Sequence, residues 1–138
     1  MNTEVIDELI CSQVFSKMCF KLDQLDDEGV IKFFTEDAVW FRQGQTLKGP
    51  KEMLAALNAR PANLFVQHIL HQLVCEHVGN KHIKANAYMT VYRKAFAEKP
   101  VPPLPAQAPD MLIIWDAEFT RSGDSWLISR LDNKPLYR

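Results

Sequence analysis

Apolar positions recur every three or four residues at the start of the chain and predict a long helix over residues 3–22. Two neighbouring rows make up this apolar stripe: Ile6, Ile10, Val14, Met18 and Leu22, beside Cys11, Phe15, Cys19 and Asp23. A stripe of this width normally faces a protein core. Asp23 is its one charged member and stands at its end. The pattern fits either a helix-end cap or a carboxylate held against the interior.

Short elements are expected next. Asp26 or Asp27 can cap a second helix over residues 28–35, since aspartate side chains accept hydrogen bonds from the first turn of a helix. A brief strand over residues 38–42 and a turn through Gly44 follow. Gly49-Pro50 opens a third helix over residues 51–58, because proline is tolerated in a first helical turn.

From residue 64 onward, apolar residues alternate as in strands. Residues 65–78 and 82–96 form a predicted hairpin around Gly79-Asn80, and residues 111–121 and 125–137 form a second hairpin around Gly123. The proline-rich stretch KPVPPLPAQAP lies between them as a loop. Helices followed by long antiparallel strands indicate an α+β fold, with N-terminal helices packed on one face of a curved sheet. We expect a single domain over residues 1–138.

The first strand of this sheet is apolar on both faces. Phe65, Ile69 and Leu73 are expected on one face, and Val66, Leu70 and Val74 on the other. One face then takes the helices. The outer face is expected to pair with a second copy of the chain in a homodimer.

Composition excludes several classes of function. Sixteen basic and seventeen acidic residues give a net charge of −1, so there is no basic surface for nucleic acid. No apolar run is long enough for a membrane span, and no signal peptide is expected. The odd number of cysteines, Cys11, Cys19 and Cys75, indicates reduced thiols in a cytoplasmic protein.

His68 shares a strand face with Val66 and Leu70, so it is expected to face the core. An aspartate that accepts from one imidazole nitrogen fixes the tautomer and leaves the other nitrogen free as a general base. Asp23 and His68 are therefore the candidate catalytic pair. The same spacing also fits a core histidine with satisfied hydrogen bonds and a helix-end cap.

Arg93 follows a row of slim side chains on one face of its strand, and its guanidinium could bind a carboxylate or an enolate oxygen. An arginine that reaches to the rim is the alternative. The expected lining of a pocket for a small apolar or aromatic molecule is Phe15, Cys19, Trp40, Val66, Leu70, Met89 and Arg93. Trp40 and Trp115 also fit ordinary aromatic core packing.

No motif for a metal or a cofactor is present. His68 and His71 are three residues apart and point to opposite faces of a regular strand. His77 and His82 flank a turn, where Glu76 is nearby, and an exposed hairpin end explains them. No cysteine pair has zinc spacing, and no glycine-rich phosphate loop occurs. We expect neither a metal nor a cofactor.

Four stretches carry a resemblance to a known family: LDQLDDEGVIKFFTEDAVW, TLKGPKEM, FVQHILHQLV and SGDSWLISRL. Together they resemble the SnoaL-like branch of the nuclear transport factor 2-like (NTF2-like) superfamily. The resemblance implies a cone-shaped cystatin-like roll. Superfamily enzymes such as scytalone dehydratase and hexachlorocyclohexane dehydrochlorinase use an aspartate–histidine pair, and Asp23 and His68 fall on those two places.

The chain departs from scytalone dehydratase at Leu22, where that enzyme has tyrosine, and at VYRKAF, where it has a second pocket histidine. The resemblance therefore implies a dyad and not a particular substrate. The expected function is a cofactor-independent lyase or isomerase, of dehydratase, isomerase or cyclase type. The alternative is a non-catalytic binding protein, or a subunit similar to the small subunit of a ring-hydroxylating dioxygenase.

Overall fold

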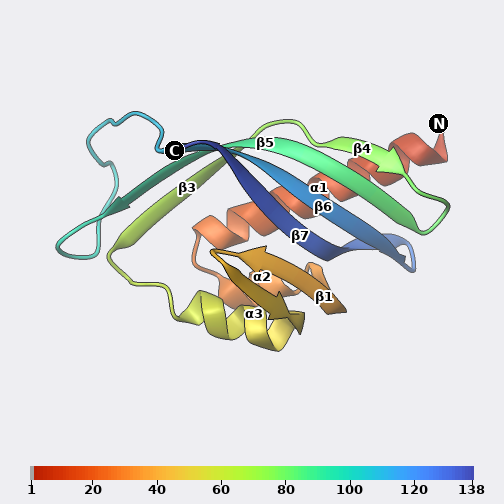
Figure 1. Ribbon diagram of the computed structural model, residues 1–138, viewed down its shortest axis with the longest axis horizontal. Coiled ribbons are helices and arrows are strands. Elements are labelled where there is room, and N and C mark those ends of the chain that lie inside the picture. Colours follow the sequence, from red (N-terminus) through yellow and green to blue (C-terminus); the bar gives the residue numbers. More distant parts are fainter. Residues whose placement is uncertain (1) are drawn as a thin grey trace.

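A curved seven-stranded sheet bends around one long helix in the computed structural model, which describes residues 2–138 (Figure 1). The helices are α1 (Thr3–Asp23), α2 (Asp27–Ile31) and α3 (Gly49–Asn58). The strands are β1 (Phe34–Arg42), β2 (Gln45–Lys48), β3 (Leu64–Leu70), β4 (Val74–His77), β5 (His82–Ala95), β6 (Met111–Ser122) and β7 (Ser125–Tyr137). The predicted α+β class, with N-terminal helices on a curved sheet, is confirmed.

The sheet has the order β2-β1-β7-β6-β5-β3, and β4 also pairs with β5. All pairs are antiparallel except β1 with β7. Figure 1 shows α1 crossing the concave side of the long strands, while α2 and α3 lie beside β1. No helix within residues 2–138 is long and apolar enough to cross a lipid bilayer.

Helix α1 begins where the Asn2 side chain accepts a hydrogen bond from the Glu4 backbone N–H at 2.8 Å. The predicted helix ends within one residue of the observed one. Its buried face contains Asp7 in place of Ile6. The Asp7 carboxylate accepts from Arg121 Nη2 at 2.7 Å and from Trp126 Nε1 at 3.1 Å. These partners explain why a second acid is tolerated in the stripe.

The segment between residues 28 and 48 differs from its prediction. Helix α2 ends at Ile31, and β1 already starts at Phe34, which pairs with Ile128 of β7. Strand β2 was not expected. It forms a hairpin with β1 through Gln43 and Gly44, whose φ angles of 51° and 77° are those of a two-residue turn with both residues left-handed.

The predicted strand over residues 65–78 is wrong in its second half. Leu70 pairs with Met89, but Val74 pairs with Asn86, so this strand carries one extra residue relative to β5. Such a bulge reverses which face the following side chains take. Leu73 is buried, whereas Val74 is 69% exposed on the outer face and not beside Leu70.

Gly49 connects β2 to α3 and sets the position of that helix. Its φ is +79°, and an added Cβ would lie 3.1 Å from the Glu36 carbonyl oxygen. Gly79 has a similar φ of +75°, but nothing lies within 4 Å of an added Cβ. An alanine at either position has the strained left-handed backbone, but only an alanine at position 49 also has a close steric contact.

Gly49→Ala is expected to lower the free energy of unfolding more than Gly79→Ala, which should cost about 1–2 kcal/mol for the left-handed backbone alone. The difference reflects the contact with the Glu36 carbonyl. Urea denaturation of both variants measures it. Equal losses in the two variants would contradict this account of Gly49.

Candidate active site

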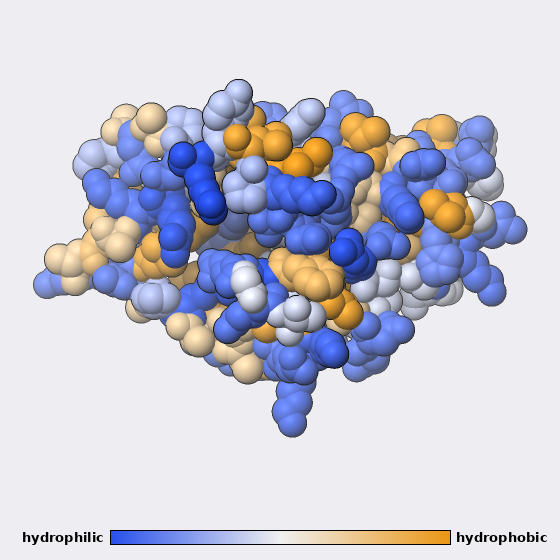
Figure 2. Space-filling view, viewed as in Figure 1, coloured by the Kyte–Doolittle hydropathy of each residue, from blue (hydrophilic) through white to orange (hydrophobic). Residues whose placement is uncertain are grey.

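A cavity of about 500 Å³ opens at the wide end of the sheet, between β1 and the strand pair β3–β5. Figure 2 shows a hollow in this face of the molecule, with hydrophobic residues inside and a largely hydrophilic rim. The lining is Leu22, Trp40, Arg42, Gln43, Arg60, Leu64, Val66, His68, Val91, Arg93, Met111, Ile113, Trp115, Asn133, Pro135 and Arg138. It combines apolar and aromatic walls with a few polar groups, as in small-molecule sites.

His68 lines the floor of this cavity, and Asp23 binds it from outside the cavity lining. The Asp23 Oδ1 and the His68 Nδ1 lie 2.5 Å apart, and the Asp23 Oδ2 accepts the backbone N–H of His68 at 2.7 Å. Both side chains are nearly buried, with 10% of Asp23 and 12% of His68 exposed. One carboxylate thus binds the ring and the backbone of the same residue. This arrangement fixes the imidazole relative to the end of α1.

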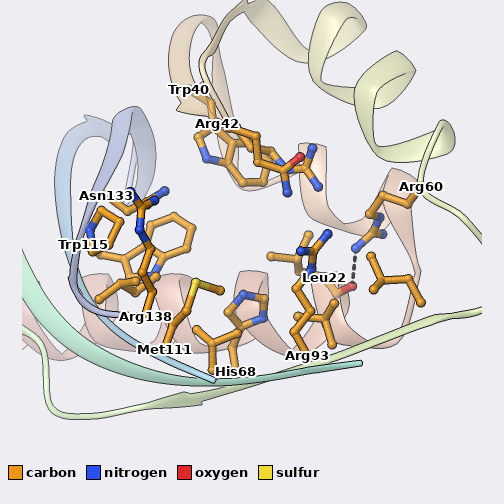
Figure 3. Close-up of a pocket in the computed structure, with 16 residues that line it drawn as sticks. Leu22, Trp40, Arg42, Arg60, His68, Arg93, Met111, Trp115, Asn133 and Arg138 are labelled. Carbon is orange, nitrogen blue, oxygen red and sulfur yellow. Dashed lines mark hydrogen bonds between the residues drawn. The ribbon is translucent and has the colours of Figure 1, made fainter. Parts of the chain in front are cut away.

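The hydrogen bonds assign the roles of the two imidazole nitrogens. A carboxylate only accepts hydrogen bonds, so Nδ1 carries the proton that it donates to Asp23. His68 lines the cavity, and Figure 3 shows its ring rising from the floor into the open space. The Nε2 atom is then the nitrogen that a bound molecule can reach. Such a nitrogen is suited to accept a proton.

Trp115 forms the wall next to His68. The two rings are 6.5 Å apart between centroids and meet edge to face at 74°. Trp115 is held from behind, because its Nε1 donates to Met89 Sδ at 2.9 Å and its ring meets Phe15 edge to face at 5.6 Å. Phe15 and Met89 are fully buried and do not line the cavity. They support the wall and do not form it.

The remaining predicted lining residues divide in the same way. Trp40, Val66 and Arg93 line the cavity together with His68. Leu70 is packed against the core, outside the cavity lining. Cys19 is buried one helical turn before Asp23. Burial raises the pKa of its thiol, and the charge of Asp23 raises it further. Cys19 therefore lies behind the dyad as an uncharged thiol.

Sequence reasoning missed several lining residues: Leu22, Arg42, Arg60, Met111, Ile113 and Asn133. Leu22 precedes Asp23 and belongs to the buried stripe, so the apolar pattern could have predicted that it lies next to the cavity. Arg60 lies just after α3, and it donates to the Leu22 carbonyl oxygen at 3.0 Å and to Asp27 at 2.5 Å. These bonds join the ends of all three helices at the cavity. The sequence around Arg60 contains no pattern that predicts contacts with residues so distant in the chain.

The other histidines are remote from the cavity lining. His71 contacts Thr90 Oγ1 at 3.0 Å on the exposed face, and His77 contacts the Glu4 carbonyl oxygen at 3.2 Å. Among residues 2–138, no group of three or more histidine, cysteine, aspartate or glutamate side chains could hold a metal ion. The three cysteines are free thiols.

Comparison with protein families shows to which family the chain belongs. The model of the SnoaL-like domain matches residues 3–132, and the chain belongs to this family, within the NTF2-like superfamily. None of the curated proteins matches the chain.

Solved structures share the fold at low sequence identity. An NTF2-like protein with a cystatin-like fold from Novosphingobium aromaticivorans has 17% identity and a TM-score of 0.81, covering 97% of this chain and 84% of its own. The hexachlorocyclohexane dehydrochlorinase LinA-type3 from Novosphingobium barchaimii has 17% identity and a TM-score of 0.81, covering 97% and 89%. Aln2 from a Streptomyces species has 17% identity and a TM-score of 0.75, covering 98% and 93%.

The geometry predicts that neutral His68 exists as the tautomer protonated on Nδ1. Long-range ¹H–¹⁵N correlation spectra of histidine-labelled protein, recorded at a pH where the ring is neutral, measure this directly. Asp23→Asn is expected to weaken the preference, because a neutral amide can also donate. A ring protonated on Nε2 in the unsubstituted protein would contradict the assignment, and His71→Gln identifies the exposed histidine signal as a control.

Proposed function

We propose that the protein is a cofactor-independent enzyme in which His68 abstracts a proton from a small apolar or aromatic substrate. The observation that carries this proposal is the arrangement of the imidazole: Nδ1 is bound to Asp23 at 2.5 Å, and the ring faces a cavity of about 500 Å³. A fixed base beside enclosed space for a guest is the minimum that proton abstraction requires.

The type of reaction depends on where the electrons go after His68 removes a proton from the substrate. Nε2 takes a hydrogen from a carbon next to a carbonyl or to a leaving group, and the electron pair of the C–H bond moves into the substrate. It either forms an enolate or expels the leaving group, which gives isomerisation, cyclisation, dehydration or another elimination. The Asp23 carboxylate stabilises the imidazolium that forms and holds the ring in place. A positioned base of this kind typically contributes about two to four powers of ten in rate.

The aromatic walls favour a flat, apolar substrate. Trp115 meets His68 edge to face, and Trp40 lies next to Trp115, with the two ring centroids 6.3 Å apart. A dehydrochlorinase has the same fold, which is in keeping with elimination chemistry. The alternative role as a dioxygenase-type subunit needs no cavity beside His68, so the cavity favours the enzyme.

His68→Ala is expected to reduce proton abstraction by about two to four powers of ten, because the base is removed while the bond from the residue 68 backbone N–H to Asp23 still joins α1 to β3. The measurement is deuterium exchange at the carbon next to the carbonyl of 2-tetralone, an aromatic ketone, followed by NMR in D₂O. His71→Ala is the matched control, since His71 lies on the exposed face only three residues away.

Exchange that survives His68→Ala at the unsubstituted rate would show that His68 is not the base. An unsubstituted protein that accelerates exchange in none of a panel of cyclic ketones, but binds them, would favour the non-catalytic binding role. The exchange rate of Asp23→Asn is expected to lie between those of His68→Ala and His71→Ala, because the imidazole remains but loses its charged partner.

The outer face of the sheet supports a homodimer. Strand residues on this face include Phe65, Ile69, Tyr88, Leu112 and Ile114, and Tyr88 pairs directly with Ile114 across β5 and β6. Tyr88 is 55% exposed and Ile69 is 50% exposed. An apolar patch on a sheet face is often covered by a second copy in small domains.

Ile114→Glu is expected to convert a dimer to a monomer, because it places a charge in the centre of this patch. Sedimentation velocity at several protein concentrations measures the state. Leu9→Glu on α1 is the control, since Leu9 is 57% exposed but lies away from the sheet. Dissociation by Leu9→Glu alone would move the interface to the helix.

A further inference from the structure

The arginines of this protein are distributed unevenly. The chain has six, and four of them line the cavity: Arg42, Arg60, Arg93 and Arg138. The other two bind carboxylates elsewhere, with Arg121 next to Asp7 at 2.7 Å and Arg130 within 4 Å of Glu118 and Asp132. A chain with a net charge of −1 therefore gathers most of its guanidinium groups at one hollow.

Acidic partners are unevenly distributed as well. Arg60 is neutralised by Asp27 at 2.5 Å. Within residues 2–138, Arg42, Arg93 and Arg138 form no ion pair with a carboxylate, and no aspartate or glutamate belongs to the cavity lining. Arg42 is half-buried, where an unpaired guanidinium is costly, whereas Arg93 and Arg138 are exposed. A bound anion would relieve that cost.

Arg42 and Arg93 approach the same space from opposite sides. Arg42 comes from the end of β1, where its guanidinium lies 5.8 Å from the centre of the Trp40 ring. Arg93 rises from β5 at the floor of the cavity, below Arg42 in the view of Figure 3. Burial lowers the pKa of Arg42, and the positive charges of Arg60 and Arg93 lower it further, as expected for like charges in one place.

The strand register places this charge and the base on one face of the sheet. His68 of β3 pairs with Val91 of β5, and Arg93 is two residues further along the same face. The backbone positions of Val91 and Arg93 are therefore roughly 7 Å apart. A single bound molecule in the cavity can contact both His68 and Arg93, because both side chains line it.

The cavity walls around His68 and Arg93 suit an aromatic or alicyclic molecule. Met111, Ile113 and Trp115 are apolar, while Gln43 and Asn133 add amide groups that can donate hydrogen bonds. The Trp40 Nε1 is buried and has no hydrogen-bond partner in the described part of the chain. The lining thus offers donors around an apolar middle. A single guanidinium can bind a carboxylate with two parallel hydrogen bonds.

We infer that the cavity selects a substrate with an aromatic or alicyclic body and a carboxylate, which Arg42 and Arg93 bind while His68 faces the reacting carbon. This inference rests on the proposed function for the identity of the reacting end. The charge selection itself is a binding property and can be measured without turnover.

The test compares 2-naphthoate with 2-naphthamide, its neutral analogue of nearly the same shape, by isothermal titration calorimetry at low salt. The carboxylate is expected to bind at least about tenfold more tightly, as one charge-assisted pair allows. Arg93→Gln and Arg42→Gln should each remove most of this preference and leave naphthamide binding unchanged. Arg130→Gln, which removes a guanidinium outside the cavity lining, should leave both affinities unchanged.

Equal affinity for the two probes, or an equal loss of both in Arg93→Gln, would overturn the inference. Inorganic phosphate is a third probe. If it binds as tightly as naphthoate, the part of the inference that requires an apolar body is wrong. His68→Ala should keep the charge preference. Lost preference with intact deuterium exchange contradicts this inference alone, whereas absent exchange with intact preference contradicts the proposed function alone.

Discussion

The contact between Asp23 and His68 is the constraint on which the site depends. A carboxylate near the C-terminal end of a helix is unfavourable, because the helix dipole is negative there, and nearly complete burial adds a desolvation cost. Two hydrogen bonds from one residue offset both: the ring bonds to Oδ1 and the backbone N–H to Oδ2. The same bonds attach α1 to β3, so the structural link and the candidate catalytic link are one interaction.

The cavity exists because the helices cover only part of the concave face. Along β5, the inward side chains from Ile83 to Val91 are buried under α1 and its neighbours, whereas Arg93 lies beyond them and is exposed. The Arg60 bonds to Leu22 and Asp27 hold the helix ends at the border of the uncovered part. Apolar packing at one end of the cone therefore leaves room at the other.

Periodicity predicted α1, the hairpin of β6 and β7, and the inward direction of His68, because amphipathic spacing reports which side chains face the core. It left Asp23 and His68 open between a catalytic pair and ordinary packing, and the family resemblance singled them out. The prediction failed between Leu70 and Val74, where one extra residue exchanges the inward and outward positions of the strand. The order of apolar residues does not reveal such a bulge. The prediction also failed for Arg42 and Arg60, which reach the cavity through contacts distant in sequence. Phe15 and Met89 face the interior as expected, but they pack behind Trp115.

The parallel pairing of β1 with β7 has a consequence for how the chain is made. Trp40 lies opposite Leu131, so β1 cannot pair with β7 until all the strands between them have been synthesised. Pairings between such distant segments form slowly, because closing a long loop costs entropy. Nascent β1 can form its hairpin with β2 first, and its other edge stays unpaired until β7 is present. The arrival of β7, and not the folding of the helices, is the event that joins β1 to the long strands around the cavity.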